Sequence, residues 1–269
     1  MKVSLNGFDV HYRAAGDGPP LVLIHGIGFN SVWWEHQLQA LGRAYRVLAI
    51  DLRGFGDSHA SHQPPPDVDA LVEDLRAFVT KVAPTGVSAI GHSLGGMLLL
   101  KFAAAHPQLL TSMVLAGASA SFTSEPGRKM LEARIEVLER EGVKGMIEKT
   151  LHHTVSPHFA PGFMERHPEV VETIKAMFLK IDPKAYISLS RAIMRFDVVA
   201  QLGQIRCPTL IIVGEHDNRC PIADASVLNM RMPTSWMKVF PDTGHSPMVE
   251  QPDFFNDTVT DFLRRSSGR

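Results

Sequence analysis

The stretch Ala89–Met97 reads AIGHSLGGM and places one serine, Ser93, between Gly91 and Gly95. The apolar segment VSAI precedes this glycine-rich stretch, and the helix-like segment MLLLKFAAAHP follows it. In this context G-x-S-x-G forms a sharp strand-to-helix turn that exposes the serine above a sheet. We therefore predict strained backbone angles at Ser93 and glycines that let the two arms of the turn pass closely.

Short apolar runs of similar form recur along the chain and predict buried strands. They are LVLIHG (21–26), RVLAID (46–51), GVSAIGHS (86–93), TSMVLAGA (111–118) and TLIIVGEHD (209–217). Residues 3–12 alternate around Asn6-Gly7 and predict a hairpin. Amphipathic helices are predicted over residues 68–82 and at the end, over residues 252–265. Buried strands separated by helices predict an α/β fold with a mostly parallel sheet covered on both faces.

The strand pattern stops between residues 122 and 202, where the sequence becomes helical. We predict one α/β core domain of residues 1–121 and 203–269, with residues 122–202 inserted as a four-helix lid. Leu131, Ile135 and Leu138 form one apolar stripe, and Gly142 is expected to end that helix. Asp182-Pro183 supplies an N-cap and a proline at the first position of another helix.

Composition excludes several classes of partner. Of the 269 residues, 45% are hydrophobic and 20% charged, as in a soluble globular protein. Lys and Arg number 27 against 28 Asp and Glu, so we expect neither a nucleic acid nor a membrane surface as partner. Two cysteines, Cys207 and Cys220, fit free thiols in a reducing compartment, and the first residues lack a secretion-signal pattern. We expect a cytoplasmic protein, and its oligomeric state stays open.

A serine hydroxyl needs a base within hydrogen-bond reach, and that base needs an acid to orient it. Asp217 follows the predicted strand TLIIV, and His245 lies in the loop PDTGHSP before the last helix. The chain order Ser93, Asp217, His245 is that of a triad on a strand–turn–helix elbow. Asp242 is a weaker choice for the acid because it lies three residues before His245 in a predicted turn. Glu215 is interpreted as a loop carboxylate.

Five motifs in order, GHSLGG, HGIG (25–28), DLRGFGDS (51–58), GEHD (214–217) and GH (244–245), resemble those of the α/β-hydrolase superfamily with a helical lid. Within it, the sequence is most similar to small bacterial esterases and enol-lactonases. The helix N-terminus favours Leu94 N–H as one donor to an oxyanion. The resemblance implies a second donor, the N–H of Ile27. In DLRGFGDS we expect Arg53 and Asp57 to pair and to stabilise their loop.

Metal and cofactor chemistry is not predicted. The sequence holds 13 histidines, of which His152, His153 and His158 are the densest group, but none has the spacing of a zinc site. His92, beside Ser93, is expected to face away from it and to be structural.

Large apolar side chains suggest a substrate pocket. Phe29 and Trp34 follow the predicted oxyanion loop, although Trp33 and Trp34 cannot both face the site. Met130, Met177 and Met194 lie in the predicted lid and adapt to irregular apolar ligands. The methionines fit a packed lid core at least as well as a substrate pocket.

The sequence therefore predicts a serine hydrolase that cleaves carboxylic esters or lactones, small and apolar, through an acyl-enzyme. One alternative is hydrolysis of carbon–carbon bonds in ring-cleavage products. Ser246 disfavours it, since that branch of the superfamily often has tryptophan after the catalytic histidine. A non-catalytic small-molecule receptor and cofactor-free oxygen chemistry are further alternatives on the same fold.

Overall fold

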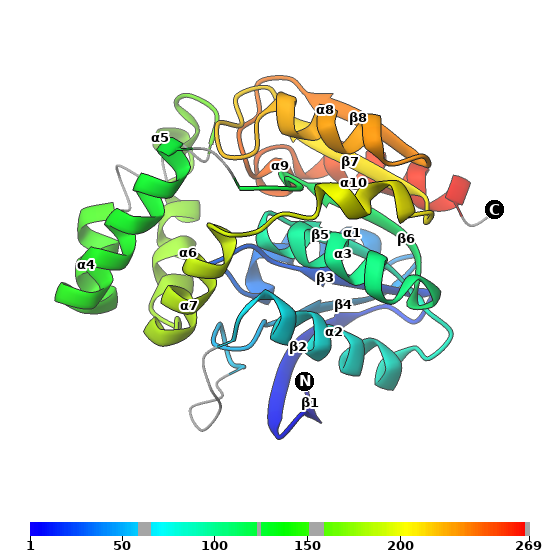
Figure 1. The fold of residues 1–269 in the computed structure, drawn as a ribbon, viewed down its shortest axis with the longest axis horizontal. Coiled ribbons are helices and arrows are strands. Elements are labelled where there is room, and N and C mark those ends of the chain that lie inside the picture. The colour runs from blue at the N-terminus through cyan, green and yellow to red at the C-terminus, as the bar shows by residue number, and fades with distance from the viewer. Residues whose placement is uncertain (59–65, 123–124, 151–158, 267–269) are drawn as a thin grey trace.

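The strands form one sheet whose order places the predicted site residues together. The computed structural model describes residues 1–58, 66–122, 125–150 and 159–266 (Figure 1). Within these ranges an eight-stranded sheet has the order β1-β2-β4-β3-β5-β6-β7-β8. The strands are β1 (Lys2–Leu5), β2 (Phe8–Ala15), β3 (Pro20–Ile24), β4 (Arg46–Ile50), β5 (Val87–His92), β6 (Leu110–Ala116), β7 (Thr209–Gly214) and β8 (Ser235–Phe240).

From β4 to β8 all neighbouring strands are parallel, and only the pairs β1–β2 and β2–β4 are antiparallel. The five runs predicted as buried strands are β3 to β7, and their side chains form the core. The chain crosses from one side of β3 to the other between β4 and β5. Crevices at the carboxyl ends of strands beside such a reversal are where open α/β sheets bind ligands.

Helices cover the sheet on both faces, α2 packing on α3 and α1 on α10. The helices of the core are η1 (Ser31–Trp34), α1 (Glu35–Leu41), α2 (Val68–Val82), α3 (Leu94–Ala105), η2 (Pro107–Leu109), η5 (Val199–Gln204), α8 (Ile222–Arg231), α9 (Pro247–Glu250) and α10 (Pro252–Ser266). The prediction of an α/β fold with a mostly parallel sheet covered on both faces is thus confirmed.

Local signals placed most elements correctly. The hairpin turn has φ of 49° at Asn6 and 84° at Gly7, as a tight two-residue turn requires. The Asp182 side chain accepts the N–H of Lys184 at 2.8 Å and so caps α7 (Pro183–Ile193) as predicted. Strand β8 was not predicted, because as an edge strand it is only partly buried and lacks a continuous apolar run.

Helices α4 (Glu125–Thr150), α5 (Phe163–Arg166), α6 (Pro168–Phe178) and α7 (Pro183–Ile193) lie between β6 and β7 in the chain and form a group at one side of the molecule (Figure 1). Gly142 has non-helical angles, φ of 68° and ψ of −170°, and so ends the first of two helices that are joined across a kink within α4, as predicted. The Asp182 N–H donates to the Gly54 carbonyl at 2.8 Å. The group therefore contacts the loop that follows the carboxyl end of β4. Among the described residues, no helix has both the length and the apolar character needed to cross a bilayer.

Candidate active site

Ser93 lies at a sharp turn between β5 and α3 with φ of 53° and ψ of −115°. Positive φ is strained for a residue with a side chain, so the prediction of strained angles at Ser93 is confirmed. A Cβ on Gly91 would lie 2.4 Å from the Gly95 carbonyl oxygen, and one on Gly95 would lie 2.2 Å from that of Ile24. Only glycine at these two positions allows helix α3 to pass so closely to strands β5 and β3.

Asp217 and His245 come together at the carboxyl ends of β7 and β8. His245 donates from Nδ1 to Asp217 Oδ2 at 2.8 Å, and both side chains are buried. The other carboxylate oxygen of Asp217 accepts the N–H groups of Arg219 at 2.8 Å and Cys220 at 2.9 Å. These bonds hold the imidazole in the tautomer whose Nε2 accepts a proton. Asp242 instead lies exposed in a turn, where its N–H donates to Glu215.

His92 differs from the prediction that it faces away from the site. It is fully buried, and its Nε2–H donates to the backbone carbonyl of His245 at 2.9 Å. The two imidazole centroids lie 4.9 Å apart. Burial, and then the charge of His245, hold the pKa of His92 well below its usual value. The end of β5 therefore contacts the loop after β8, and the order of residues along the chain does not reveal this contact.

Glu250, which the sequence analysis did not single out, gathers the loop of His245. Its carboxylate accepts the N–H of Gly244 at 2.9 Å and that of Ser246 at 3.1 Å, the residues on either side of His245. It also accepts the N–H of Ala160, from the segment before α5, at 2.7 Å. Burial raises the pKa of Glu250, against the lowering effect of these backbone hydrogen bonds. Its position five residues after His245 is the one sequence signal that could have indicated Glu250.

The loop after β3 faces the elbow, as expected for an oxyanion loop. A Cβ on Gly26 would lie 3.2 Å from the Ser93 Cβ. His25 is buried; its Nε2 accepts the N–H of Leu52 at 3.0 Å, and its Nδ1–H donates to the Gly26 carbonyl at 2.7 Å. Burial lowers the pKa of His25, in keeping with this neutral state.

The two backbone groups predicted to bind an oxyanion lie in suitable elements. Ile27 is half-buried in this loop, and Leu94 is the first residue of α3. The first amides of a helix have no partner within it and favour negative charge. The roles of Ile27 and Leu94 stay predictions.

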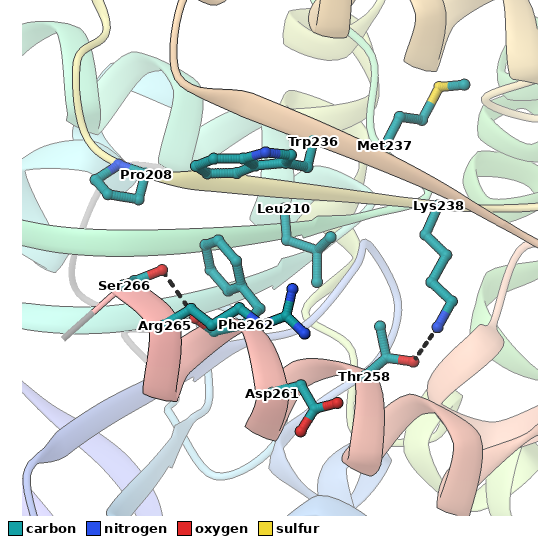
Figure 2. Close-up of a pocket in the computed structure, with 10 residues that line it drawn as sticks. All are labelled: Pro208, Leu210, Trp236, Met237, Lys238, Thr258, Asp261, Phe262, Arg265 and Ser266. Carbon is teal, nitrogen blue, oxygen red and sulfur yellow. Dashed lines mark hydrogen bonds between the residues drawn. The ribbon is translucent and has the colours of Figure 1, made fainter. Parts of the chain in front are cut away.

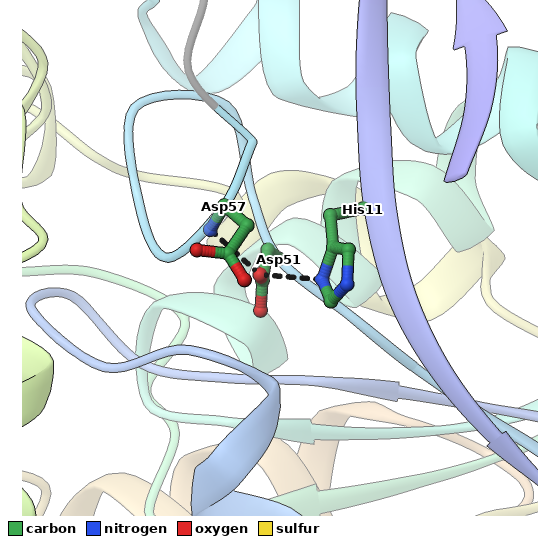
Figure 3. Close-up of side chains that lie close together, drawn as sticks. All are labelled: His11, Asp51 and Asp57. Atoms are coloured by element: carbon green, nitrogen blue, oxygen red, sulfur yellow. Dashed lines mark hydrogen bonds and ion pairs between the residues drawn. The ribbon is translucent and has the colours of Figure 1, made fainter. Parts of the chain in front are cut away.

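Asp51 lies beside His11 and Asp57 (Figure 3) and also organises the start of η1, next to this loop. Its carboxylate accepts the N–H of Ser31 at 2.6 Å, the N–H of Asp57 at 2.9 Å and Nδ1 of His11 at 3.0 Å. Ligand atoms of His11, Asp51 and Asp57 lie within 4.8 Å of one another, the spacing of a metal site. Since the Asp51 carboxylate already accepts from these three donors, we interpret the cluster as structural.

A second group with such spacing, Glu215, His216 and Asp242, lies in an exposed turn. Acidic groups are common on exposed turns without an ion. The cluster His152, His153 and His158 lies outside the described residues.

The predicted pairing of Arg53 with Asp57 is wrong. Arg53 donates from Nε to Asp74 of α2 at 2.8 Å, whereas Asp57 pairs with Lys180, after α6, at 2.8 Å. The chain reverses between them at Gly54 and Gly56, both with positive φ, so the two side chains reach different elements. Cys207 and Cys220 are free, as predicted.

The predicted pocket residues are spread over the core and the inserted helices. The ring of Phe29 stacks on that of Trp33 with ring centroids 4.2 Å apart, and it meets the Phe178 ring edge-on with centroids 6.1 Å apart. Trp34 is fully buried. Met177 is buried, and Met130 and Met194 are half-buried. The ring centroids of Phe29 and His92 lie 6.0 Å apart. Among the predicted pocket residues, Phe29 therefore has the best supported contact with the site. The pocket roles of Trp34 and the three methionines stay predictions.

A cavity of about 600 Å³ lies between β8 and α10 (Figure 2). Its lining includes Leu210 and Trp236, near the amino ends of β7 and β8, and Phe262 of α10. Ser93, Asp217 and His245 follow the carboxyl ends of their strands. Because the strands are parallel, this cavity lies at the opposite end of the sheet from these three candidate residues.

Comparisons with known proteins agree with this geometry. Residues 21–258 match the model of the alpha/beta hydrolase family. The chain is 27% identical to 3-oxoadipate enol-lactonase 2 of Acinetobacter baylyi, over 98% of this chain and 97% of that protein.

Two solved structures are similar over almost the whole chain. The enol-lactonase of Burkholderia xenovorans has a TM-score of 0.88 at 28% identity and covers 98% of this chain and 99% of its own. A thermophilic esterase of Thermogutta terrifontis has a TM-score of 0.87 at 28% identity, with 99% of both chains covered. The fold, the strained serine turn and the family match together identify this chain as a member of the alpha/beta hydrolase family.

Proposed function

We propose that this protein is a serine hydrolase that cleaves carboxylic esters or lactones through an acyl-enzyme. The hydrogen bond between His245 and Asp217, beside the strained turn at Ser93, carries the proposal. The hydrogen bond leaves Nε2 of His245 as the basic atom. The turn presents the Ser93 hydroxyl at the start of helix α3.

In the proposed reaction Ser93 Oγ attacks the carbonyl carbon while His245 Nε2 takes the hydroxyl proton. The carbonyl oxygen becomes an oxyanion, to which the N–H groups of Ile27 and Leu94 donate. When this intermediate collapses, the carbon–oxygen bond to the leaving group breaks, and His245 returns the proton to that oxygen. Water then attacks the acyl-enzyme with His245 again as base, and this releases the acid and restores Ser93.

The substrate class draws support from the relatives, whose names include an enol-lactonase and an esterase. Both reactions break a carbonyl carbon–oxygen bond, so one mechanism serves both. We further propose that residues 122–202 form the lid of the site on the core of residues 1–121 and 203–269. The contacts of Phe178 with Phe29 and of Asp182 with Gly54 place α6 and α7 beside the loops that follow β3 and β4.

The decisive experiment measures hydrolysis of p-nitrophenyl esters and of lactones by the wild-type chain and by Ser93→Ala. We expect Ser93→Ala to lower kcat about a thousandfold or more while the melting temperature stays close to that of the wild type, since alanine keeps the Cβ and loses only the hydroxyl. A fluorophosphonate probe should label Ser93 in the wild type only. Full activity in Ser93→Ala, or an unlabelled wild type that binds small molecules without turnover, would contradict the proposal and favour a receptor.

A further inference from the structure

The cavity between β8 and α10 has an exposed aromatic wall. Strand β8 is the last strand of the sheet, and Trp236 near its start is 57% exposed. The ring of Trp236 lies beside that of Phe262, with centroids 6.2 Å apart, and Pro208 and Leu210 extend the apolar wall (Figure 2). A cavity of about 600 Å³ has the size of pockets that bind small molecules. An apolar group that covered the indole would remove its surface from water, which favours binding.

Lys238 places a positive charge in the lining of this cavity. It is half-buried on β8, and its Nζ donates to Oγ1 of Thr258, on α10, at 3.0 Å (Figure 2). The same Nζ lies 4.3 Å from the centre of the Phe254 ring. Within the described parts of the chain, no carboxylate lies within ion-pair distance of it. These contacts fix the ammonium in position and leave N–H groups for a ligand, since an ammonium has three.

Arg265 of α10 adds a second positive charge to the lining. Its guanidinium is exposed and has no ion-pair or hydrogen-bond partner among the residues that the structure describes. Asp261, one turn earlier on α10, also lines the cavity but forms an ion pair with neither Arg265 nor Lys238. The described lining therefore holds two cations and one carboxylate, and neither cation is neutralised by a close partner.

An apolar wall beside two cations is complementary to an anion that has an apolar part. A neutral apolar compound would leave both cations without a partner, and a small inorganic anion would leave the Trp236 ring in water. A carboxylate on an alkyl chain satisfies both parts of the lining. Its oxygens accept from the ammonium of Lys238 and the guanidinium of Arg265, while its chain covers Trp236 and Phe262.

We propose that this cavity is a second binding site, for a carboxylate that carries an alkyl chain. The site goes beyond the proposed hydrolysis and is separate from the candidate triad. Its strand residues Leu210 and Trp236 lie near the amino ends of β7 and β8, whereas Asp217 and His245 follow the carboxyl ends of these strands. A ligand bound in the cavity therefore makes no contact with either of these two residues.

Octanoate is the probe, and tryptophan emission gives a local signal. Trp33 and Trp34 are buried, so the exposed indole of Trp236 supplies the part of the emission at the longest wavelengths. Octanoate should move this emission to shorter wavelengths as its chain covers the ring, and Trp236→Phe should lack the change.

Calorimetric titration measures the affinity. We expect octanoate to bind about tenfold more tightly than octan-1-ol, which has the same chain length but no charge, because charge-assisted hydrogen bonds form only with the anion. Added salt should weaken the binding of octanoate, since it screens the two cations.

Two variants test the cations separately. Lys238→Gln should weaken octanoate binding about tenfold, because the ammonium is half-buried and poorly screened. Arg265→Gln should weaken it about twofold to fivefold, since an exposed charge contributes less. Arg264→Gln is the matched control: Arg264 is the preceding residue of α10 and is exposed, but it does not line the cavity. This control should leave the Kd unchanged.

Circular dichroism shows whether each variant is folded, and if Lys238→Gln is not, Arg265→Gln and the salt dependence decide. Three results would overturn the site. They are octanoate binding no tighter than that of octan-1-ol, a Kd that neither cation variant raises, and binding without a change in the emission of Trp236. Octanoate bound at the candidate active site instead would give the second and third of these results.

Discussion

The carboxylate of Glu250 accepts the backbone N–H of Ala160 at 2.7 Å, although ninety residues separate them in the chain. Through its bonds to Gly244 and Ser246 the same carboxylate holds the loop of His245. One side chain therefore joins the inserted segment to the loop that carries the proposed base. A shift of this segment would therefore displace the loop that carries His245.

Replacing Glu250 by Gln should lower both stability and kcat. Glutamine keeps one acceptor oxygen, but its amide group opposes a backbone N–H, which costs about 1–3 kcal/mol of the free energy of unfolding. We expect kcat to fall about tenfold with a smaller change in KM, measured on a p-nitrophenyl ester. The control is Glu172→Gln, which removes an exposed pair with Lys175 and should change neither quantity. Unaltered kcat in Glu250→Gln would show that the loop of His245 does not depend on this carboxylate.

The choice of acid predicts a sharp contrast between two aspartates. Asp217→Asn should lower kcat by about three to four orders of magnitude, because an amide no longer accepts reliably from Nδ1 and the wrong imidazole tautomer results. Asp242→Asn should leave kcat unchanged, since that carboxylate is exposed and lies in a turn. Steady-state kinetics of both variants decide the matter, and the reverse pattern would make Asp242 the acid.

Two buried histidines predict loss of stability in acid. Burial lowers the pKa of His25 and His92 in the folded state, whereas in the unfolded chain both titrate near about 6.5. Below that value the unfolded state binds more protons, so the free energy of unfolding falls as the pH falls. Each histidine contributes up to about 1.4 kcal/mol per pH unit. The raised pKa of Glu250 acts in the opposite direction.

Urea unfolding at pH 7.5, 6.5 and 5.5 measures this slope. We expect stability to be retained between pH 7.5 and 6.5 and to decline toward pH 5.5, and His92→Gln to have a shallower decline than the wild type. Equal slopes in the two proteins would mean that His92 is charged in the folded state.

Close packing at the elbow predicts that Gly95→Ala is strongly destabilising. The new Cβ would lie 2.2 Å from the carbonyl oxygen of Ile24, and neither the start of α3 nor the end of β3 can move freely in the buried core. We expect a loss of about 2 kcal/mol or more in the free energy of unfolding, with a fall in kcat as Ser93 shifts. Gly203→Ala is the matched control, because its nearest atom would be 4.0 Å away, and it should cost less than about 0.5 kcal/mol. Thermal and urea melts of the two variants test the contrast.

Features that depend on a few neighbouring residues could be predicted from the sequence. The buried strands β3 to β7 were found because they are covered on both faces and are therefore continuously apolar. The Ser93 turn and the cap at Asp182 were found because their residue patterns are local. Strand β8 was missed because its position at the edge of the sheet leaves its pattern mixed.

Contacts between distant parts of the chain were decided by the tertiary structure alone. Arg53 binds Asp74 rather than Asp57, and His92 turns toward His245. Glu250 reaches Ala160, and Arg134 donates to Tyr186. The sequence by itself determined the sheet, the elbow and the candidate triad, because apolar periodicity and glycine sterics act over a few residues. Only folding decided which charged and polar groups share a buried space, because a hydrogen bond or an ion pair depends on distance in space and not on separation along the chain.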